Sequence, residues 1–551
     1  MRKILVANRG EIAVRVIRAC RDVGLASVAV YSECDRTARH VRMADEACAI
    51  GPSAPAESYL RIDRLLDAAR RTQADALHPG YGFLAENAEF ASACRDAGLT
   101  FIGPTPEAIA LMGSKTAARR AAMAAGVPVV SGTEQPFGTG DPDSDIASAA
   151  ARLGYPLLIK AIAGGGGKGM RRVDGPDDLA SAIRGARSEA DTAFGDSSIY
   201  LERRLARPRH IEVQLLGDQH GTVLPFVERE CSIQRRHQKV IEETPSPVVS
   251  PALRAHMMNA AAAVARSVGY TSAGTIEFLL DEEGRFWFLE MNTRLQVEHP
   301  ITEMVTGIDL VAWQIRIARG ERLDVDAVDA TTPRGHAIEC RIYAEDPDAG
   351  FMPSPGRITA LRAPGGPWIR DDGGAEPGAD VPIYYDPLIS KLAAWGLDRA
   401  QALARMKRAL REYEVLGIQT TVPFFRWILD QPAFDTAAFH TGYLDELLQQ
   451  RQGEPFVTAD KNDEDVAAIA AALHLTAQRR AGASGANPVS AGSPPRTPAR
   501  WGAFAQTSLG AGSPPRQRGG VPWLAPQTFA PQAGLGTKCW KQRGRLEGLR
   551  A

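Results

Sequence analysis

Short apolar segments typical of strands alternate with helical patterns through the first 104 residues. The helical spacing of apolar residues occurs at 12–23 and 57–72. Strand-like segments lie at 2–8, 27–32, 76–80 and 100–104. Strands that alternate with helices form mostly parallel sheets. The first turn, Arg9-Gly10-Glu11, lacks the G-x-G-x-x-G sequence, which argues against a dinucleotide-binding domain. The N-terminal part is therefore predicted to be a parallel α/β domain.

From about residue 113 the pattern changes to strands joined by turns. Strands are predicted on both sides of a glycine loop in 155–173, and at 197–205, 210–218, 275–292 and 336–344, before a closing helix at 398–414. A chain of 551 residues is long enough for roughly three or four domains.

The composition narrows the class of protein. Apolar residues make up 44% and charged residues 23%, as in ordinary globular proteins. A net charge of −1 gives no reason to expect nucleic acid or an anionic membrane as a partner.

No run of eighteen apolar residues exists, and the N-terminus reads as a strand and a helix, not as a signal peptide. The seven cysteines include no C-x-x-C pair, which favours a reducing, cytoplasmic setting without a disulfide framework or a structural zinc site.

After about residue 476 the sequence becomes poor in large apolar residues. The string AGSPPR occurs at 491–496 and again at 511–516, and the tail carries eleven Lys and Arg but a single acidic residue, Glu547. Such a segment cannot bury enough apolar surface to order itself, so it is predicted to be flexible. It could contact an acidic surface, or be a solvated linker.

The glycine run GGGGKG (164–169) lies between two predicted strands. Glycines allow backbone N–H groups to approach phosphate oxygens closely, and Lys160 and Lys168 add positive charge. The run is not a P-loop, because Ser or Thr does not follow the Gly-Lys pair. A phosphate-covering loop and a simple hairpin tip are both consistent with it.

Residues 275–292 alternate on both sides of Glu283-Gly284, which predicts a hairpin with a two-residue turn. In that register Glu277 lies opposite Glu290, and Asn292 shares the face of Glu290. Opposed carboxylates repel, so a positive charge should lie between them, and oxygen ligands suit Mg²⁺. Two solvated acids on an exposed sheet face are the alternative.

Two further clusters are suited to anions. Residues 235–239 (Arg-Arg-His-Gln-Lys) form a dense set of donors, although a basic surface loop would read the same way. If the strand continues, Arg294, Gln296 and Glu298 project to one side. An arginine beside a glutamate suits an anionic substrate that must lose a proton, and it also suits a structural salt bridge.

Taken together, these stretches closely resemble the biotin carboxylase family of the ATP-grasp fold. The matching strings follow the family order over about residues 1–446: KILVANRGEIA, HPGYGFLAEN, GSK at 113–115, KAIAGGGGKGM, RPRHIEVQ, ERECSIQRRHQK, GTIEFL, EMNTRLQVEHPITE, GHAIECRIYAEDP and YYDPLISKL. The overall sequence most resembles the alpha subunits of acyl-CoA carboxylases of the methylcrotonoyl-CoA type.

The resemblance implies a domain plan. It consists of an N-terminal α/β biotin carboxylase domain (1–112), an ATP-grasp domain (113–320) with a glycine-rich lid at about 131–203, and a C-terminal α+β domain (334–446). Residues 447–551 would hold a partial linker and the basic tail. The A-M-K-M sequence of a biotinyl domain is absent, so the carrier is expected on a separate chain, with loss by truncation as the alternative.

The resemblance also assigns roles to individual residues. ATP contacts would fall on Lys115, Lys160, Gly166, Gly167, the segment Glu202 to Leu205, His210 and His237. The ligands of Mg²⁺ or Mn²⁺ would be Glu277, Glu290 and Asn292. Bicarbonate would meet Arg294, Gln296, Val297, Glu298 and Lys239, and Arg341 would meet both biotin and bicarbonate. Without the resemblance, His210 would be interpreted only as a strand residue and Glu202 only as an exposed acid. Two positions depart from the family pattern, Arg203 for lysine and Thr421 for asparagine.

The implied activity is ATP-dependent carboxylation of biotin by bicarbonate through carboxyphosphate. Partners would be a second copy in a homodimer or larger complex, a biotin carboxyl carrier protein, and a carboxyltransferase subunit. The alternatives are a different ATP-grasp ligase that joins a carboxylate to an amine, and a catalytically silent ATP-binding assembly subunit. The Arg294–Glu298 run argues against the first, and the intact matched positions argue against the second.

Overall fold

The computed structural model describes residues 1–138, 140–162, 169–457 and 461–483. Residues 1–456 belong to one compact unit. The described part of a second unit is mainly helix α17 (Lys461–Ala483).

The prediction that the chain is flexible after about residue 476 was therefore wrong for 476–483, because the alanine-rich stretch before these residues favours a helix that continues through them. Gly166, Gly167 and Lys168 of the glycine loop, and residues 484–551, lie outside the described residues.

The N-terminal sheet is parallel and has the order β3-β2-β1-β4-β5. Its strands are β1 (Lys3–Val6), β2 (Ala26–Ser32), β3 (Glu46–Gly51), β4 (Ala76–His78) and β5 (Thr100–Phe101). Both faces of β1 are buried, since Ile4 and Val6 join one apolar cluster while Leu5 joins another. This explains the unbroken apolar run of the first strand and confirms the predicted parallel α/β domain.

Helices α1 (Gly10–Asp22), α3 (Ile62–Thr72) and α4 (Ala88–Asp96) accompany this sheet. The helix predicted at 57–72 begins only at Ile62, because Tyr59 is fully buried and donates to Asp35 at 2.8 Å. Strand β3 and helix α4 were not predicted, because both are short and rich in small residues.

A large antiparallel sheet runs through the centre of the unit in the order β14-β13-β9-β11-β12-β15-β22-β20. Its strands are β9 (Arg209–Gly217), β11 (Arg229–Arg235), β12 (Gln238–Thr244), β13 (Ser272–Leu280), β14 (Phe286–Asn292), β15 (His336–Tyr343), β20 (Ile369–Gly373) and β22 (Leu388–Gly396). A short strand, β10 (Val223–Pro225), pairs with β9. One sheet thus connects the central and C-terminal thirds of the chain.

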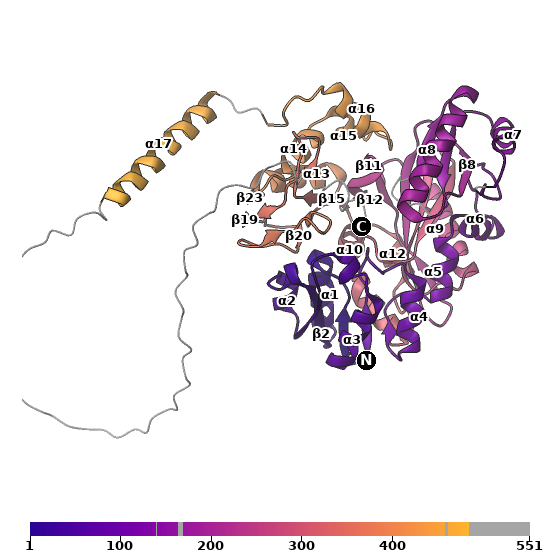
Figure 1. Cartoon of the computed structure of the whole chain (residues 1–551), viewed down its shortest axis with the longest axis horizontal. Helices are drawn as coiled ribbons and strands as arrows, with labels where there is room; N and C mark the ends of the chain where they lie inside the picture. Colours follow the sequence, from indigo (N-terminus) through magenta and orange to yellow (C-terminus); the bar gives the residue numbers. More distant parts are fainter. Residues whose placement is uncertain (139, 163–168, 458–460, 484–551) are drawn as a thin grey trace, which may run out of the picture. The chain divides into compact units, whose positions relative to one another are not determined.

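Other helices of this unit pack on the smaller sheet or in the C-terminal core (Figure 1). Helices α7 (Asp143–Leu153) and α8 (Pro176–Phe194) pack on a small sheet formed by β6 (Leu157–Ala161), β7 (Met170–Val173) and β8 (Ile199–Arg203). The C-terminal core contains α13 (Arg399–Glu412) and α14 (Val422–Leu429). Further helices are α5 (Pro106–Gly113), α6 (Lys115–Ala124), α9 (Pro251–Ser267), α10 (His299–Thr306), α11 (Leu310–Ala318) and α16 (Tyr443–Gln450).

Buried ion pairs connect α1 to both other thirds of the chain. Glu303 on α10 accepts from Arg15 on α1 at 2.8 Å and from Arg370 on β20 at 2.7 Å. Nearby, a carboxylate oxygen of Glu11 lies 3.2 Å from the ammonium of Lys391 on β22. Burial raises the pKa of Glu11 to about 7, although Lys391 opposes that rise.

The raised pKa of Glu11 predicts a pH dependence of stability. The folded state holds this proton more tightly than the unfolded chain, so wild-type stability falls as pH rises from about 4.5 to 7. Glu11→Gln removes the titration, so its melting temperature should rise relative to wild type by several degrees between pH 5 and pH 8, on the order of 2 kcal/mol. Calorimetric scans of both proteins across that range would check this, and a constant difference would contradict it.

Candidate functional site

The hairpin of β13 and β14 positions the first acidic residues of the site. Glu277 pairs with Glu290 as predicted, but the connecting loop is Asp281–Arg285 and not a two-residue turn. The register shifts by one residue after Glu277, so that Phe278 pairs with Phe288. This bulge offsets the longer loop, and the predicted carboxylate pair is kept.

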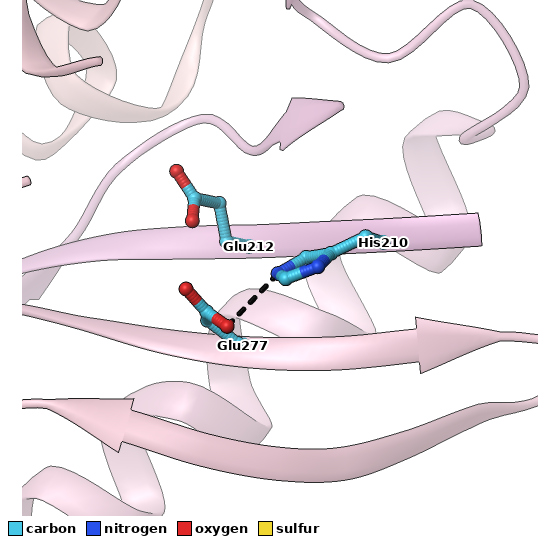
Figure 2. A group of neighbouring side chains, drawn as sticks. All are labelled: His210, Glu212 and Glu277. Carbon is cyan, nitrogen blue, oxygen red and sulfur yellow. Dashed lines mark ion pairs between the residues drawn. The ribbon is translucent and has the colours of Figure 1, made fainter. Parts of the chain in front are cut away.

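A row of carboxylates crosses the adjacent strands β9, β13 and β14. Glu277 pairs in register with Glu212 on one side and Glu290 on the other. Figure 2 shows His210 and Glu212 on β9 and Glu277 on β13, with the His210–Glu277 ion pair of 3.0 Å drawn as a dashed line. His210 and Glu277 are both buried, so the row is not a solvated surface feature.

Lys239 places a positive charge beside two carboxylates of this row and beside Glu298. Its ammonium donates to Glu212 at 2.6 Å, to Glu277 at 2.7 Å and to Glu298 at 2.8 Å. Burial alone would lower the pKa of Lys239, but these carboxylates raise it well above its usual value. The positive charge that the sequence required beside Glu277 is therefore supplied in part by the protein itself.

A tight turn between β11 and β12 places Lys239 beside these carboxylates. Strands β11 and β12 are joined by Arg236 and His237, both with positive φ, at 49° and 68°. Two such residues match the twist of a two-residue hairpin turn, although side chains seldom adopt this conformation. The donor cluster 235–239 thus divides: Lys239 enters the site, while Arg236 and His237 are exposed at the turn.

Glu212 was missed by the sequence analysis although it is central. Arg229 is fully buried and holds Glu212 through an ion pair, while it donates to Gln214 at 3.0 Å and to Thr302 at 2.8 Å. The alternating string His210, Glu212, Gln214 in one strand was the signal that could have revealed it.

Residues 293–298 form a bend and not the continuing strand that the sequence suggested. Their side chains still converge, because Arg294 donates to Gln296 at 2.9 Å and Gln296 donates to Glu277 at 3.2 Å. Arg294 also pairs at 2.8 Å with Glu86, a partner that the sequence analysis did not identify.

Arg341 on β15 closes the other side of the site. Its guanidinium donates to Glu242 at 2.7 Å and to the second carboxylate oxygen of Glu298 at 3.0 Å. Burial opposes ionisation of Glu298, but Lys239 and Arg341 together bring its pKa well below the usual value. Burial raises the pKa of Glu242 to about 7, although Arg341 opposes that rise. Thr421 donates to the Arg341 carbonyl at 3.4 Å, so this substituted position supports the backbone of Arg341.

The proposed nucleotide contacts lie on the small sheet and its neighbours. Lys160 and Arg119 form buried ion pairs with Glu202, so Glu202 is not an exposed acid. Lys115 donates to the Ala161 carbonyl at 3.0 Å, and burial lowers its pKa. Leu205 is half-buried just beyond β8.

The residues predicted to hold a metal ion offer oxygen donors. Burial and the adjacent Glu277 raise the pKa of Glu290, so a cation placed between these two carboxylates would relieve their repulsion. The side-chain amide of Asn292 donates to Glu277 at 2.9 Å, while its oxygen accepts from Arg294 at 3.0 Å. This donor set fits a hard divalent cation such as Mg²⁺. His210, Glu212 and Glu277 also place ligand atoms within 4.8 Å of one another.

Comparison with known proteins decides the family. Residues 1–109 match the biotin carboxylase N-terminal domain, 114–326 the ATP-binding domain of the carbamoyl-phosphate synthase L chain, and 339–446 the biotin carboxylase C-terminal domain. A biotin carboxylase of Nostoc is 52% identical over 445 residues, which are 81% of this chain and 99% of the relative. The chain belongs to the biotin carboxylase family. It is the ATP-dependent biotin carboxylase component of a biotin-dependent carboxylase.

Other biotin carboxylase relatives agree with this assignment. One of the pyruvate carboxylase subunits of Methanothermobacter thermautotrophicus is 54% identical over 444 residues, 81% of this chain and 89% of the relative. The biotin carboxylase domain dimer of Hydrogenobacter thermophilus 2-oxoglutarate carboxylase, solved with MgADP, ADP and bicarbonate, is 46% identical with a TM-score of 0.79. The match covers 83% of this chain and 99% of that domain. Together with the sheets described above, these matches confirm the predicted three-domain fold.

The cysteines and the helices of the described residues have two further properties. Cys20, Cys34, Cys48, Cys94, Cys231 and Cys340 are free thiols. Among the described helices, none is both long enough and apolar enough to cross a membrane.

Proposed function

We propose that Lys239, Glu298 and Arg341 form the centre at which this biotin carboxylase activates bicarbonate and carboxylates biotin on a carrier. The observation that carries the proposal is that one carboxylate, Glu298, is held between the ammonium of Lys239 and the guanidinium of Arg341. An acid between two cations offers a proton acceptor beside sites for two anions. The bicarbonate and nucleotide in the 46% identical domain support this assignment.

The nucleotide would lie between the small sheet and the carboxylate row. Lys115 and Lys160 supply positive charge there, and His210 and His237 border the same region from β9 and the β11–β12 turn. Glu202 to Leu205 would meet the adenine, largely through the backbone. Phosphoryl transfer depends mainly on positioning and charge neutralisation, which this arrangement provides.

Bicarbonate would occupy the space bordered by Arg294, Gln296, Val297 and Glu298. The low pKa of Glu298 makes it a weak base while Lys239 and Arg341 both contact it. Anionic substrates would recruit these same cations, and the pKa of Glu298 would then rise toward a value suited to accepting the bicarbonate proton. Arg341 would afterwards stabilise the negative oxygen that develops on the biotin ureido group.

Glu277, Glu290 and Asn292 would hold Mg²⁺ or Mn²⁺. The metal ion would supply charge neutralisation for the ATP phosphates. The protein's part is to keep Glu277 ionised, because Lys239 and then His210 outweigh the effect of burial and lower the pKa of Glu277.

The metal assignment predicts opposite effects of Glu290→Gln on stability and activity. Without Mg²⁺ the variant should melt about 2 °C above wild type, because the repulsion between Glu277 and Glu290 is gone. Addition of MgCl₂ should stabilise wild type more than the variant, and the variant should lose about 100-fold in turnover. Glu283→Gln, in the exposed hairpin loop, is the matched control and should change neither property. Equal Mg²⁺ stabilisation of Glu290→Gln and wild type would contradict the assignment.

We infer that the carrier and the carboxyltransferase are separate chains, and that the chain serves an acyl-CoA carboxylase of the methylcrotonoyl-CoA type in the cytoplasm. The similarity of the matched strings to methylcrotonoyl-CoA carboxylase alpha subunits supports the acceptor class, and the match over 99% of the biotin carboxylase of Nostoc supports a carrier on a separate chain. Co-purification of a biotinylated chain, followed by assays with methylcrotonoyl-CoA and with pyruvate, would test this. Carboxylation of pyruvate alone would overturn the acceptor assignment.

The decisive test of the proposed chemistry is ADP release by the full chain with Mg²⁺. The rate should depend on bicarbonate and should increase when free biotin is added. ATP hydrolysis that needs an amine acceptor instead would favour another ATP-grasp ligase. ATP binding without turnover under any of these conditions would favour an assembly subunit.

A further inference from the structure

Lys391 is a buried cation with no role in the site described so far. It lies on β22, in register with Arg341 on β15, and its side chain is 0% exposed. Burying an ammonium group is costly unless charged or polar partners compensate it. The partners of Lys391 therefore indicate why this site requires a lysine.

These partners come from the other two thirds of the chain. The Lys391 ammonium donates to the Val297 carbonyl at 2.9 Å and lies 3.2 Å from a Glu11 carboxylate oxygen. It also lies 5.6 Å from the centre of the Tyr81 ring. The bond to Val297 is the contact that reaches the proposed bicarbonate segment.

We propose that Lys391 is a positioning residue that holds the 296–298 turn in the geometry that binds bicarbonate. The peptide between Val297 and Glu298 is planar and rigid, so a bond to the Val297 oxygen also restrains the backbone of Glu298. The side chain of Glu298 is held separately by Lys239 and Arg341. Lys391 thus fixes the backbone of a residue whose carboxylate is fixed from the other side.

The neighbouring junction at Glu303 provides a comparison. Arg370 donates to Glu303, which also accepts from Arg15, so this buried network connects the same thirds of the chain. Within the described residues, none of the hydrogen bonds of Arg370 reaches 296–298. Loss of Arg370 should therefore reduce stability without changing the bicarbonate segment.

The inference rests on the proposed role of residues 296–298, and steady-state kinetics can test both. Initial rates of ADP release by the full-length chain would be measured for wild type, Lys391→Met and Arg370→Met. Bicarbonate would be varied at saturating MgATP in CO₂-depleted buffer, and ATP would be varied at saturating bicarbonate. The KM for bicarbonate should rise about tenfold in Lys391→Met, while its KM for ATP stays near wild type. Arg370→Met should melt earlier but keep the wild-type KM for bicarbonate.

An unchanged KM for bicarbonate in folded Lys391→Met would overturn the inference, as would an equal rise in Arg370→Met. If circular dichroism shows that Lys391→Met does not fold, Glu11→Gln takes its place at pH 8, where Glu11 is ionised in wild type. There the loss of the counter-ion should raise the KM for bicarbonate about threefold, and no change would overturn the inference. Wild-type protein without bicarbonate-dependent ADP release would overturn the proposed function itself.

Discussion

Replacement of Lys239 by methionine should reduce the bicarbonate-dependent turnover about 1000-fold. The variant keeps an unbranched side chain about as long as the lysine stem but removes the ammonium that donates to Glu212, Glu277 and Glu298. These three acids would then keep only their other cationic partners, so their mutual repulsion would increase and anionic substrates would meet more negative charge. ADP release at saturating MgATP and bicarbonate would measure the effect.

Lys407→Met is the matched control for Lys239→Met. Lys407 lies on α13 and pairs with Asp430 at 3.0 Å, away from the site. Its loss should leave turnover unchanged. The Lys239→Met protein should also melt at higher temperature in mildly acidic buffer than at pH 8, because protonation removes the mutual repulsion of the acids. Turnover within tenfold of wild type would contradict the central role given to Lys239.

Replacement of Arg341 by alanine should separate ATP binding from biotin carboxylation. ATP affinity should stay near wild type, because Arg341 contacts Glu242 and Glu298 and not the small sheet. Biotin-stimulated turnover should fall about 100- to 1000-fold, the usual effect of losing one oxyanion donor. Isothermal titration with ATP and biotin-dependent ADP release would measure the two effects separately.

The pH profile gives Arg341→Ala a second readout. Arg341 is one of the cations that lower the pKa of Glu298, so its loss should move the acid limb of residual activity to higher pH. Arg399→Ala is the control, since Arg399 pairs with Glu243, the residue after Glu242, and has no contact with Glu298 in the described residues. An unchanged rate and an unchanged acid limb in Arg341→Ala would contradict the assigned role.

Local sequence patterns predicted the helices and strands better than they predicted the side-chain contacts of the site. The pairing of Glu277 with Glu290 follows from counting residues across a hairpin, and it survived a wrong loop length because the bulge offset the error. The parallel N-terminal sheet also followed from pattern alone, since strands alternate with helices in the first 104 residues. Strand periodicity failed at 293–298, because a bend brings Arg294, Gln296 and Glu298 together without a strand.

The acids that complete the site could not be predicted from spacing. Glu86 lies 208 residues before Arg294, its ion-pair partner, and Glu242 lies 99 residues before Arg341. Contacts of this kind depend on how distant elements pack, and a single sequence contains no local periodicity for them. The residue roles came from family resemblance, and the variants proposed above are their direct test.

The pairing of β12 with β15 has a practical consequence for the expression of separate fragments of this protein. Ile241 of β12 pairs with Cys340 of β15, although family comparison places these two residues in separate domains. A fragment that stops before residue 334 would leave β12 with an open row of backbone donors and acceptors, and a fragment that begins there would do the same to β15. Each half alone is expected to self-associate through its exposed edge. The two domains have separate sequence signatures, but they should be expressed and unfolded as one piece.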